Sequence, residues 1–205
     1  AHIRSLGLYG PVSVARLRGK RLPYVDNLVN LVVAEDLCGV PMSEVQRVLR
    51  PLGVAYVRRD GRWTRIIKPW PDEIDQWTHY LHDPQGTMVS LDRRVGLPRR
   101  LQWVGEPKWL RNHDFMSSLN GLVSANGRIF YIIDEGLRRH IYLPGRWALV
   151  ARDGFNGKVL WKRRIARWFP HTWPFKSGPA WLPRRLVAAG ERVFATLGID
   201  EPLSL

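Results

Sequence analysis

The sequence predicts an α/β unit followed by an all-β unit. Residues 28–35 are a nearly continuous apolar run rich in valine, and an amphipathic helical pattern and a second apolar run follow them. That order of strand, helix and strand is typical of an open α/β sheet. After residue 93, short apolar stretches alternate with turns rich in glycine and asparagine, which is typical of antiparallel hairpins.

The α/β unit is assigned to residues 1–69. Residues 28–35 are expected to form a strand of a parallel sheet, buried on both faces. Ser43 is expected to cap the helix that follows, and residues 54–57 begin the second strand of a βαβ unit. The strand residues singled out as buried are Val29, Leu31 and Val33.

A ribbon and a linker come next. Residues 58–69 are interpreted as a β-ribbon with its turn at Asp60 and Gly61. Residues 70–92 are expected to form a helical linker, because proline suits the first helical position and acidic residues favour the positive end of a helix. This pattern is carried by Pro71, Asp72, Glu73 and Asp75. The all-β unit then occupies residues 93–205.

The end of the linker holds the densest group of polar and aromatic residues in the chain. His79 and His82 are three positions apart, so on a helix both could face one metal ion, with Asp83 beside them. This motif lacks a third ligand nearby. The alternative is that the histidines interact with the helix dipole and stack on Trp77 or Tyr80.

A second polar pair lies further along the chain. His113 and Asp114 could act as a base and the group that orients it. No serine or cysteine nucleophile motif accompanies them, so the favoured interpretation is a pair of hydrogen-bonded loop residues.

Three stretches of the all-β unit are expected to be hairpins. Residues 149–161 run from an apolar strand through a turn to a returning strand that ends on a tryptophan, which is expected to be buried. Asp153 is expected to cap the turn and Gly157 to adopt a positive φ. Residues 123–133 and 186–197 match each other: both read apolar strand, small residue, glycine, charge, apolar strand.

The 149–161 hairpin resembles the outer hairpin of PQQ-like (quinoprotein-type) β-propeller repeats, and the stretch GRIFYI resembles their inner strands. The positions that carry the resemblance are Ala151, Asp153, Gly157, Leu160 and Trp161. It implies blades of four antiparallel strands, of which residues 93–205 would hold about two, an incomplete β-propeller. It also favours an extracytoplasmic, periplasmic location. The alternative is an unrelated β-sandwich with ordinary hairpins.

The α/β unit resembles the C-terminal half of class I S-adenosylmethionine (SAM)-dependent methyltransferases, whose sheet is Rossmann-like. The matching positions are Leu22, Pro23, Asp26, Val48, Leu49, Arg50, Pro51 and Gly53, whereas Asn30 and Leu52 depart from the family's Asp and Gly. The resemblance implies that Asp26 and Glu35 lie on the cofactor side. The Gly-rich turn that cradles the cofactor is absent, so this chain alone is expected to bind no SAM. The sequence therefore looks like a fragment cut through both domains.

Composition narrows the expected partners. The net charge of +14, from 32 Lys and Arg against 18 Asp and Glu, is compatible with nucleic-acid binding. The arginines are dispersed and follow no DNA- or RNA-binding motif, so this partner is not favoured.

The single Cys38 excludes an intrachain disulfide and a cysteine-rich zinc site. The chain lacks an apolar run of the roughly 18 residues that a membrane span needs, so none is expected.

The leading functional hypothesis is a binding or scaffold platform, formed by a PQQ-like propeller fused to a methyltransferase-like domain. The alternatives are a quinone-dependent oxidoreductase, a class that the propeller family includes, and a basic nucleic-acid-binding protein. SAM or PQQ would belong to a longer protein, and no cofactor is expected for this chain. The expected partners are the remainder of the same polypeptide and a protein or small molecule on the propeller.

Overall fold

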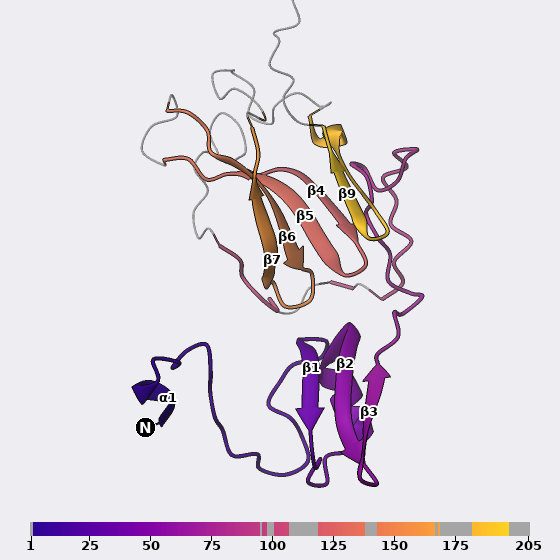
Figure 1. Ribbon diagram of the computed structural model, residues 1–205. Helices are drawn as coiled ribbons and strands as arrows, with labels where there is room; N and C mark the ends of the chain where they lie inside the picture. The colour runs from indigo at the N-terminus through magenta and orange to yellow at the C-terminus, as the bar shows by residue number, and fades with distance from the viewer. Residues whose placement is uncertain are drawn as a thin grey trace, which may run out of the picture. The chain divides into compact units, whose positions relative to one another are not determined.

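The computed structural model describes residues 2–94, 96–97, 101–106, 119–137, 143–166, 168 and 182–196. In these ranges the chain is mostly β-sheet, with two α-helices, which agrees with the sheet-rich fold expected from the sequence. It forms two compact units, Ala1–Pro69 and Trp70–Leu205 (Figure 1). None of the described helices is both long and apolar enough to span a membrane.

The first unit contains a three-stranded sheet in the order β1-β2-β3 (Figure 1). Strand β1 pairs in parallel with β2, and β2 pairs antiparallel with β3, so the predicted strand–helix–strand unit and the ribbon after it are confirmed. Both Asp60 and Gly61 in the ribbon turn have positive φ. The elements are α1 (His2–Ser5), β1 (Val29–Ala34), α2 (Met42–Val48), β2 (Leu49–Arg59) and β3 (Arg62–Ile67).

One face of this sheet is covered by α2. Val45 of the helix is fully buried against Ala55 and Val57 of β2. Leu31 and Val33 point to the opposite face and are 55% and 58% exposed, so the prediction that they are buried is wrong. Neighbouring side chains of a strand alternate between the two faces, and no described element covers the second one.

The beginning of α2 also differs from the prediction. The helix starts at Met42, and Pro41 occupies the N-cap position without a side-chain hydrogen bond. Ser43 therefore lies inside the first turn and does not cap it. Proline suits the start of a helix because it has no N–H that would need a partner.

The second unit contains two antiparallel sheets (Figure 1). Strands β4 to β7 pair in sequence order, and β8 pairs with β9, so the hairpins expected at 123–133, 149–161 and the described part of 186–197 are confirmed. The elements are β4 (Leu119–Ala125), β5 (Arg128–Asp134), β6 (Trp147–Asp153), β7 (Val159–Arg164), the 3₁₀ turn η1 (Pro183–Arg185), β8 (Leu186–Ala189) and β9 (Arg192–Ala195).

The two hairpins that match in sequence lie side by side. The Asn126 side-chain amide at the β4–β5 turn donates to the Gly190 carbonyl and to Glu191 Oε1, at 3.1 and 3.0 Å. Arg128 Nη2 is 2.7 Å from Glu191 Oε2. Residues 77–78 run between the hairpins, since their carbonyls accept the N–H groups of Ser124 in β4 and Ala188 in β8.

The core of the second unit occupies both faces of the larger sheet. Phe130, Ile132 and Leu149 pack on the face that carries β8 and η1. Tyr131 and Val150 belong to a smaller cluster on the other face. Strands β5 and β6 are therefore buried on both sides, whereas every residue of the edge strand β7 is exposed.

The predicted helical linker is wrong, because residues 70–92 contain no helix. Carboxylates in the segment bind backbone N–H groups: Asp75 accepts from Gln76 and Leu91, and Asp83 accepts from Thr87. Such side-chain bonds compete with helical ones and favour turns. The apolar Leu101 and Trp103 would suit a strand, yet residues 101–103 form none.

Trp161 is not the buried residue that the sequence predicts. It lies on the edge strand β7, is 40% exposed, and its ring centroid is 6.1 Å from that of Phe130. The neighbouring Leu160 is 43% exposed. The turn motif specifies the hairpin, but burial of the tryptophan requires a neighbour on β7 that the described residues do not supply.

We therefore expect Trp161→Ala to lower the free energy of unfolding by only about 1 kcal/mol, well below the roughly 3–5 kcal/mol of a fully buried aromatic. Urea unfolding of the variant beside the wild type measures the difference. Leu160→Ala, equally exposed on the same strand, is the control and should lose a similar or smaller amount. A loss above about 3 kcal/mol for Trp161→Ala alone would show that this ring is buried in solution.

Candidate functional site

The hairpin motif residues serve the fold. Asp153 is 1% exposed, and its Oδ1 accepts the N–H groups of Phe155 and Asn156 at 2.9 and 3.3 Å. Gly157 has a φ of 72°, so both turn predictions are confirmed. Ala151 is fully buried in the core. None of these side chains lines the pockets described below.

Asp26 and Glu35, proposed on the cofactor side of the α/β unit, lie apart. Asp26 precedes β1 and Glu35 follows it, so the length of the strand separates them. The Asp26 carboxylate is 2.6 Å from Arg47 Nη1 of α2. Arg47 also binds Glu44, and that hydrogen bond lowers the pKa of Glu44 to about 2. Asp26 thereby joins the segment before β1 to the helix.

The densest polar cluster is centred on His82, which is only 6% exposed. Its Nε2 is 2.7 Å from Asp75 Oδ2, and its Nδ1 is 3.3 Å from Asp83 Oδ2 and 3.2 Å from Thr87 Oγ1. The edge of the Trp77 ring system meets the imidazole at 5.4 Å between centroids. We call His82, Asp75, Asp83 and Thr87 the His82 clamp, because these bonds hold the chain before and after the turn.

The His82 clamp shifts the pKa values of its members. Burial acts to lower the pKa of His82, but the hydrogen bond and charge of Asp75, reinforced by Asp83, outweigh it and raise this pKa. Hydrogen bonds from Thr87 lower the pKa of Asp83 to about 2. Burial acts to raise the pKa of Asp75, and bonds from Leu91, Gln76 and His82 lower it on balance. The charged forms of both carboxylates and of His82 are therefore favoured.

This arrangement does not fit the metal site considered from the sequence. When His82 is protonated, both of its nitrogens face oxygen atoms of the clamp. His79 Nδ1 is 2.8 Å from Thr78 Oγ1 instead. Within the described ranges, no three His, Cys, Asp or Glu side chains converge as metal ligands. His113 and Asp114, the other candidate pair, lie outside the described residues.

The His82 clamp predicts a pH dependence of stability. A pKa raised in the folded state gives stability that is complete below about 6.5, the ordinary value for histidine, and is lost as the pH rises through the folded pKa. The lowered pKa of Asp83 gives stability that is lost as the pH falls from 3.8 towards about 2. The clamp is therefore strongest between these limits, in mildly acidic solution.

Urea unfolding from pH 5 to pH 9, roughly the range in which histidine titrates, tests this. We expect the wild type to lose stability as the pH rises above about 6.5, and His82→Asn to show a smaller slope. His79→Asn is the matched control, because it removes a histidine of the same turn that bonds neither Asp75 nor Asp83. Equal slopes for the wild type and His82→Asn would contradict the clamp.

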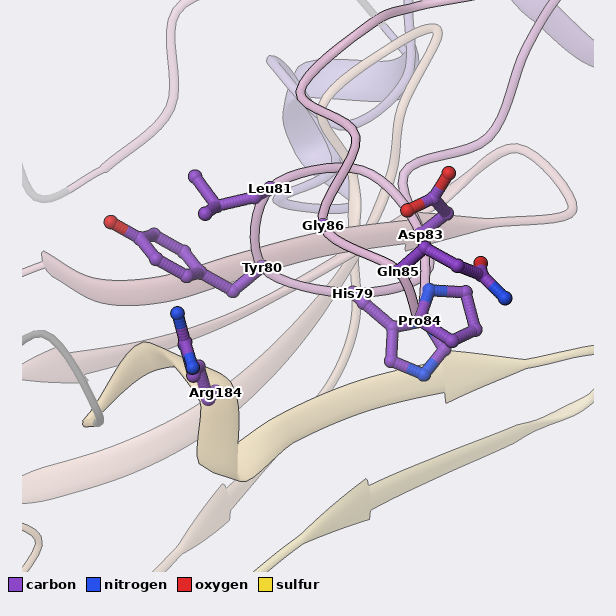
Figure 2. A pocket seen from close by; sticks show the side chains of 8 residues that line it. All are labelled: His79, Tyr80, Leu81, Asp83, Pro84, Gln85, Gly86 and Arg184. Carbon is purple, nitrogen blue, oxygen red and sulfur yellow. The ribbon is translucent and has the colours of Figure 1, made fainter.

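A pocket of about 270 Å³ lies beside the clamp, between the 79–86 turn and η1 (Figure 2). We call it the Arg184 pocket; the residues that line it are His79, Tyr80, Leu81, Asp83, Pro84, Gln85, Gly86 and Arg184. In Figure 2, Tyr80 and Arg184 stand on one side, with His79 and Gln85 on the other. The sequence indicated the histidines but not Arg184, because no local pattern joins η1 to a turn so far back in the chain.

Two further pockets lie against β5, β6 and β7. Their Lys162 is paired with Glu135 at 2.8 Å. Arg152, which lines one of them, donates to Tyr131 Oη and to the carbonyls of Gly157 and Glu106. These interactions link strands and loops of the sheet, so we regard both side chains as structural.

No known family model, curated protein or solved structure matched the chain. The candidate site is therefore defined by its own geometry: a turn fixed by the His82 clamp, with polar side chains of the turn and of η1 around one pocket.

Proposed function

We propose that this protein is a binding or scaffold platform of the PQQ-like β-propeller type, joined to a methyltransferase-like α/β unit. The observation that carries the proposal is the repeat in the second unit. Strands β4 to β7 form a four-stranded antiparallel meander, and β8 and β9 repeat its first hairpin in sequence and lie beside it. A propeller is built by radial repetition of four-stranded sheets, so a matching hairpin beside the first sheet supports the proposal.

The first unit supports the second half of the proposal. Its parallel β1–β2 pair, connected through α2, is one strand–helix–strand unit of the kind from which Rossmann-like sheets are built, and it supports this half of the proposal. Leu52, at the position where the resembling methyltransferases have glycine, has a φ of 61°. A Cβ on Gly53 would lie 2.7 Å from the Arg50 carbonyl oxygen and 3.1 Å from that of Val29. Backbone geometry at both positions thus suits the glycine pair of that family's motif.

A platform function is favoured over quinone chemistry by four carboxylates of the second unit that already have partners. Asp75 and Asp83 are held by histidine and backbone donors, Glu135 by Lys162, and Glu191 by Arg128. Each of these carboxylates already serves the fold. A quinone-dependent enzyme would need several of them to converge on a calcium ion instead.

The test is to incubate the protein with PQQ and calcium, remove free quinone by gel filtration, and measure quinone absorbance and dye-linked alcohol oxidation in the protein fraction. A parallel calorimetric titration uses SAM. A platform should retain no stoichiometric quinone, oxidise no alcohol and give no heat with SAM. Stoichiometric PQQ with turnover would establish the oxidoreductase alternative, and micromolar SAM binding would show that the first unit holds a cofactor.

A further inference from the structure

We propose that the Arg184 pocket binds a compact small molecule through a carboxylate or phosphate group held by Arg184. This inference rests on the proposed platform function and specifies the ligand class that the platform takes. Its basis is a group of polar side chains that line one pocket, of which Arg184, Tyr80 and Gln85 have no hydrogen-bond partner among the described residues.

Arg184 supplies the charge. Its guanidinium forms no ion pair or hydrogen bond with any described residue, and it lines the pocket from η1. In Figure 2 its guanidinium extends towards the ring of Tyr80. A guanidinium presents its N–H groups in a fixed fork that matches two oxygens of a carboxylate or phosphate.

Asp83 does not cancel this charge at the binding position. Its Oδ2 is 2.6 Å from Thr87 Oγ1 and 3.3 Å from His82 Nδ1, while its Oδ1 accepts the Thr87 N–H at 3.0 Å. These donors do not neutralise the carboxylate, but they turn it towards Thr87 and His82, and in Figure 2 it lies on the far side of the pocket from Arg184. Arg184 is therefore the lining residue whose charge is left for a ligand.

The remaining polar groups of the pocket can both donate and accept hydrogen bonds. Tyr80 Oη and the Gln85 amide have no hydrogen-bond partner in the described part of the chain, and His79 uses only Nδ1, towards Thr78. They add a hydroxyl, an amide and an imidazole nitrogen to the residues that line the pocket. Such a set recognises a ligand with further polar atoms, in addition to its anionic group.

The turn is rigid enough to hold these groups in place. Leu81 and His82 have φ values of 63° and 88°, which side-chain-bearing residues adopt only when their surroundings enforce it. The His82 clamp and the paired backbone bonds between His79 and His82 supply that constraint. The volume of about 270 Å³ is just below the roughly 300–1,000 Å³ of most ligand pockets, so the ligand is compact.

The test is calorimetric titration of the whole chain with sodium phosphate and, separately, with sodium acetate, in chloride buffer of fixed ionic strength. The two arms show which oxyanion the pocket prefers. The wild type should bind at least one of them with saturable heat. Arg184→Gln should weaken that binding about tenfold or more, as loss of a charge-assisted contact does.

Two matched variants separate the pocket from the general basic charge. Arg192→Gln removes the same charge from β9, and Arg164→Gln removes it from a different pocket, at β7. Both should bind within about twofold of the wild type, and Gln85→Ala should weaken binding less than Arg184→Gln does. Circular dichroism melts show whether each variant is folded, and the milder Gln85→Ala keeps the test decisive if Arg184→Gln unfolds.

The proposal is overturned if neither anion binds, or if Arg192→Gln or Arg164→Gln weakens binding as much as Arg184→Gln. These outcomes differ from failure of the platform function itself. A protein that oxidises alcohol with PQQ and still binds phosphate through Arg184 would refute the platform but keep the pocket. A protein inert in both assays would refute the pocket alone.

Discussion

Gly157→Ala is expected to destabilise the second unit by about 3 kcal/mol, through two effects at one position. The backbone φ of 72° costs an L-residue about 1–2 kcal/mol. A Cβ would also lie 2.4 Å from Cδ2 and Cε3 of the Trp103 ring. That ring cannot move aside without losing the hydrogen bond from its Nε1 to the Gly154 carbonyl, which is 3.0 Å long. Overpacking of this kind adds about 1–3 kcal/mol.

Gly190→Ala is the matched control that measures the cost of the positive φ alone. Gly190 has a φ of 55°, and no atom lies within 4 Å of the position that its Cβ would take. This variant should lose only about 1 kcal/mol in urea unfolding. If both alanine variants lose the same amount, Trp103 does not pack on the turn. Trp103→Ala combined with Gly157→Ala should remove most of the difference between them.

Lys68→Met is expected to destabilise the first unit by about 2–4 kcal/mol. The Lys68 ammonium donates to Asn27 Oδ1, to the Gln46 carbonyl and to the Leu49 carbonyl, at 2.7, 2.8 and 2.7 Å. It thus binds the C-terminal end of α2 and the segment before β1 from a position directly after β3. Methionine keeps the apolar stem but removes all three hydrogen bonds to these part-buried acceptors.

Arg65→Met serves as the control, since it removes a positive charge from the exposed surface of β3. Chemical unfolding followed by far-ultraviolet circular dichroism should show a loss within about 0.5 kcal/mol for that variant. A similar small loss for Lys68→Met would mean that the three hydrogen bonds do not form in solution. A large loss of stability in both variants would indicate that the change in net charge, and not the loss of the ammonium hydrogen bonds, lowers the stability.

Local sequence signals predicted the elements whose determinants are local. Asn126 and Gly127 both adopt the positive φ that their residue types favour, and the hairpin follows from that turn. The βαβ order around α2 was likewise readable from hydrophobic periodicity. The turns of residues 70–92 could not be predicted in this way, because acidic residues suit the first turn of a helix as well as they suit a loop. Only the folded contact of Asp75 with His82 and Leu91 decides between helix and turn.

Burial and the pocket depend on contacts that no local pattern contains. Leu31, Val33 and Trp161 are apolar residues on strands, yet their exposure is determined by what covers the sheet face or edge next to them. Arg184 reaches the 79–86 turn because β8 binds the carbonyl of Thr78 and so places η1 beside that turn. A single sequence contains no signal for such a long-range pairing.

The most direct test of the central claim is a cross-link between the turns of the two matching hairpins. In a Cys38→Ser background, Asn126→Cys and Glu191→Cys place thiols at positions whose native side chains are 3.0 Å apart. A short bis-maleimide should join them within the monomer in high yield. Glu135→Cys with Glu191→Cys is the control, since Glu135 follows the far end of β5. Efficient cross-linking of the first pair alone is expected; equal or absent cross-linking of both pairs would contradict the side-by-side repeat.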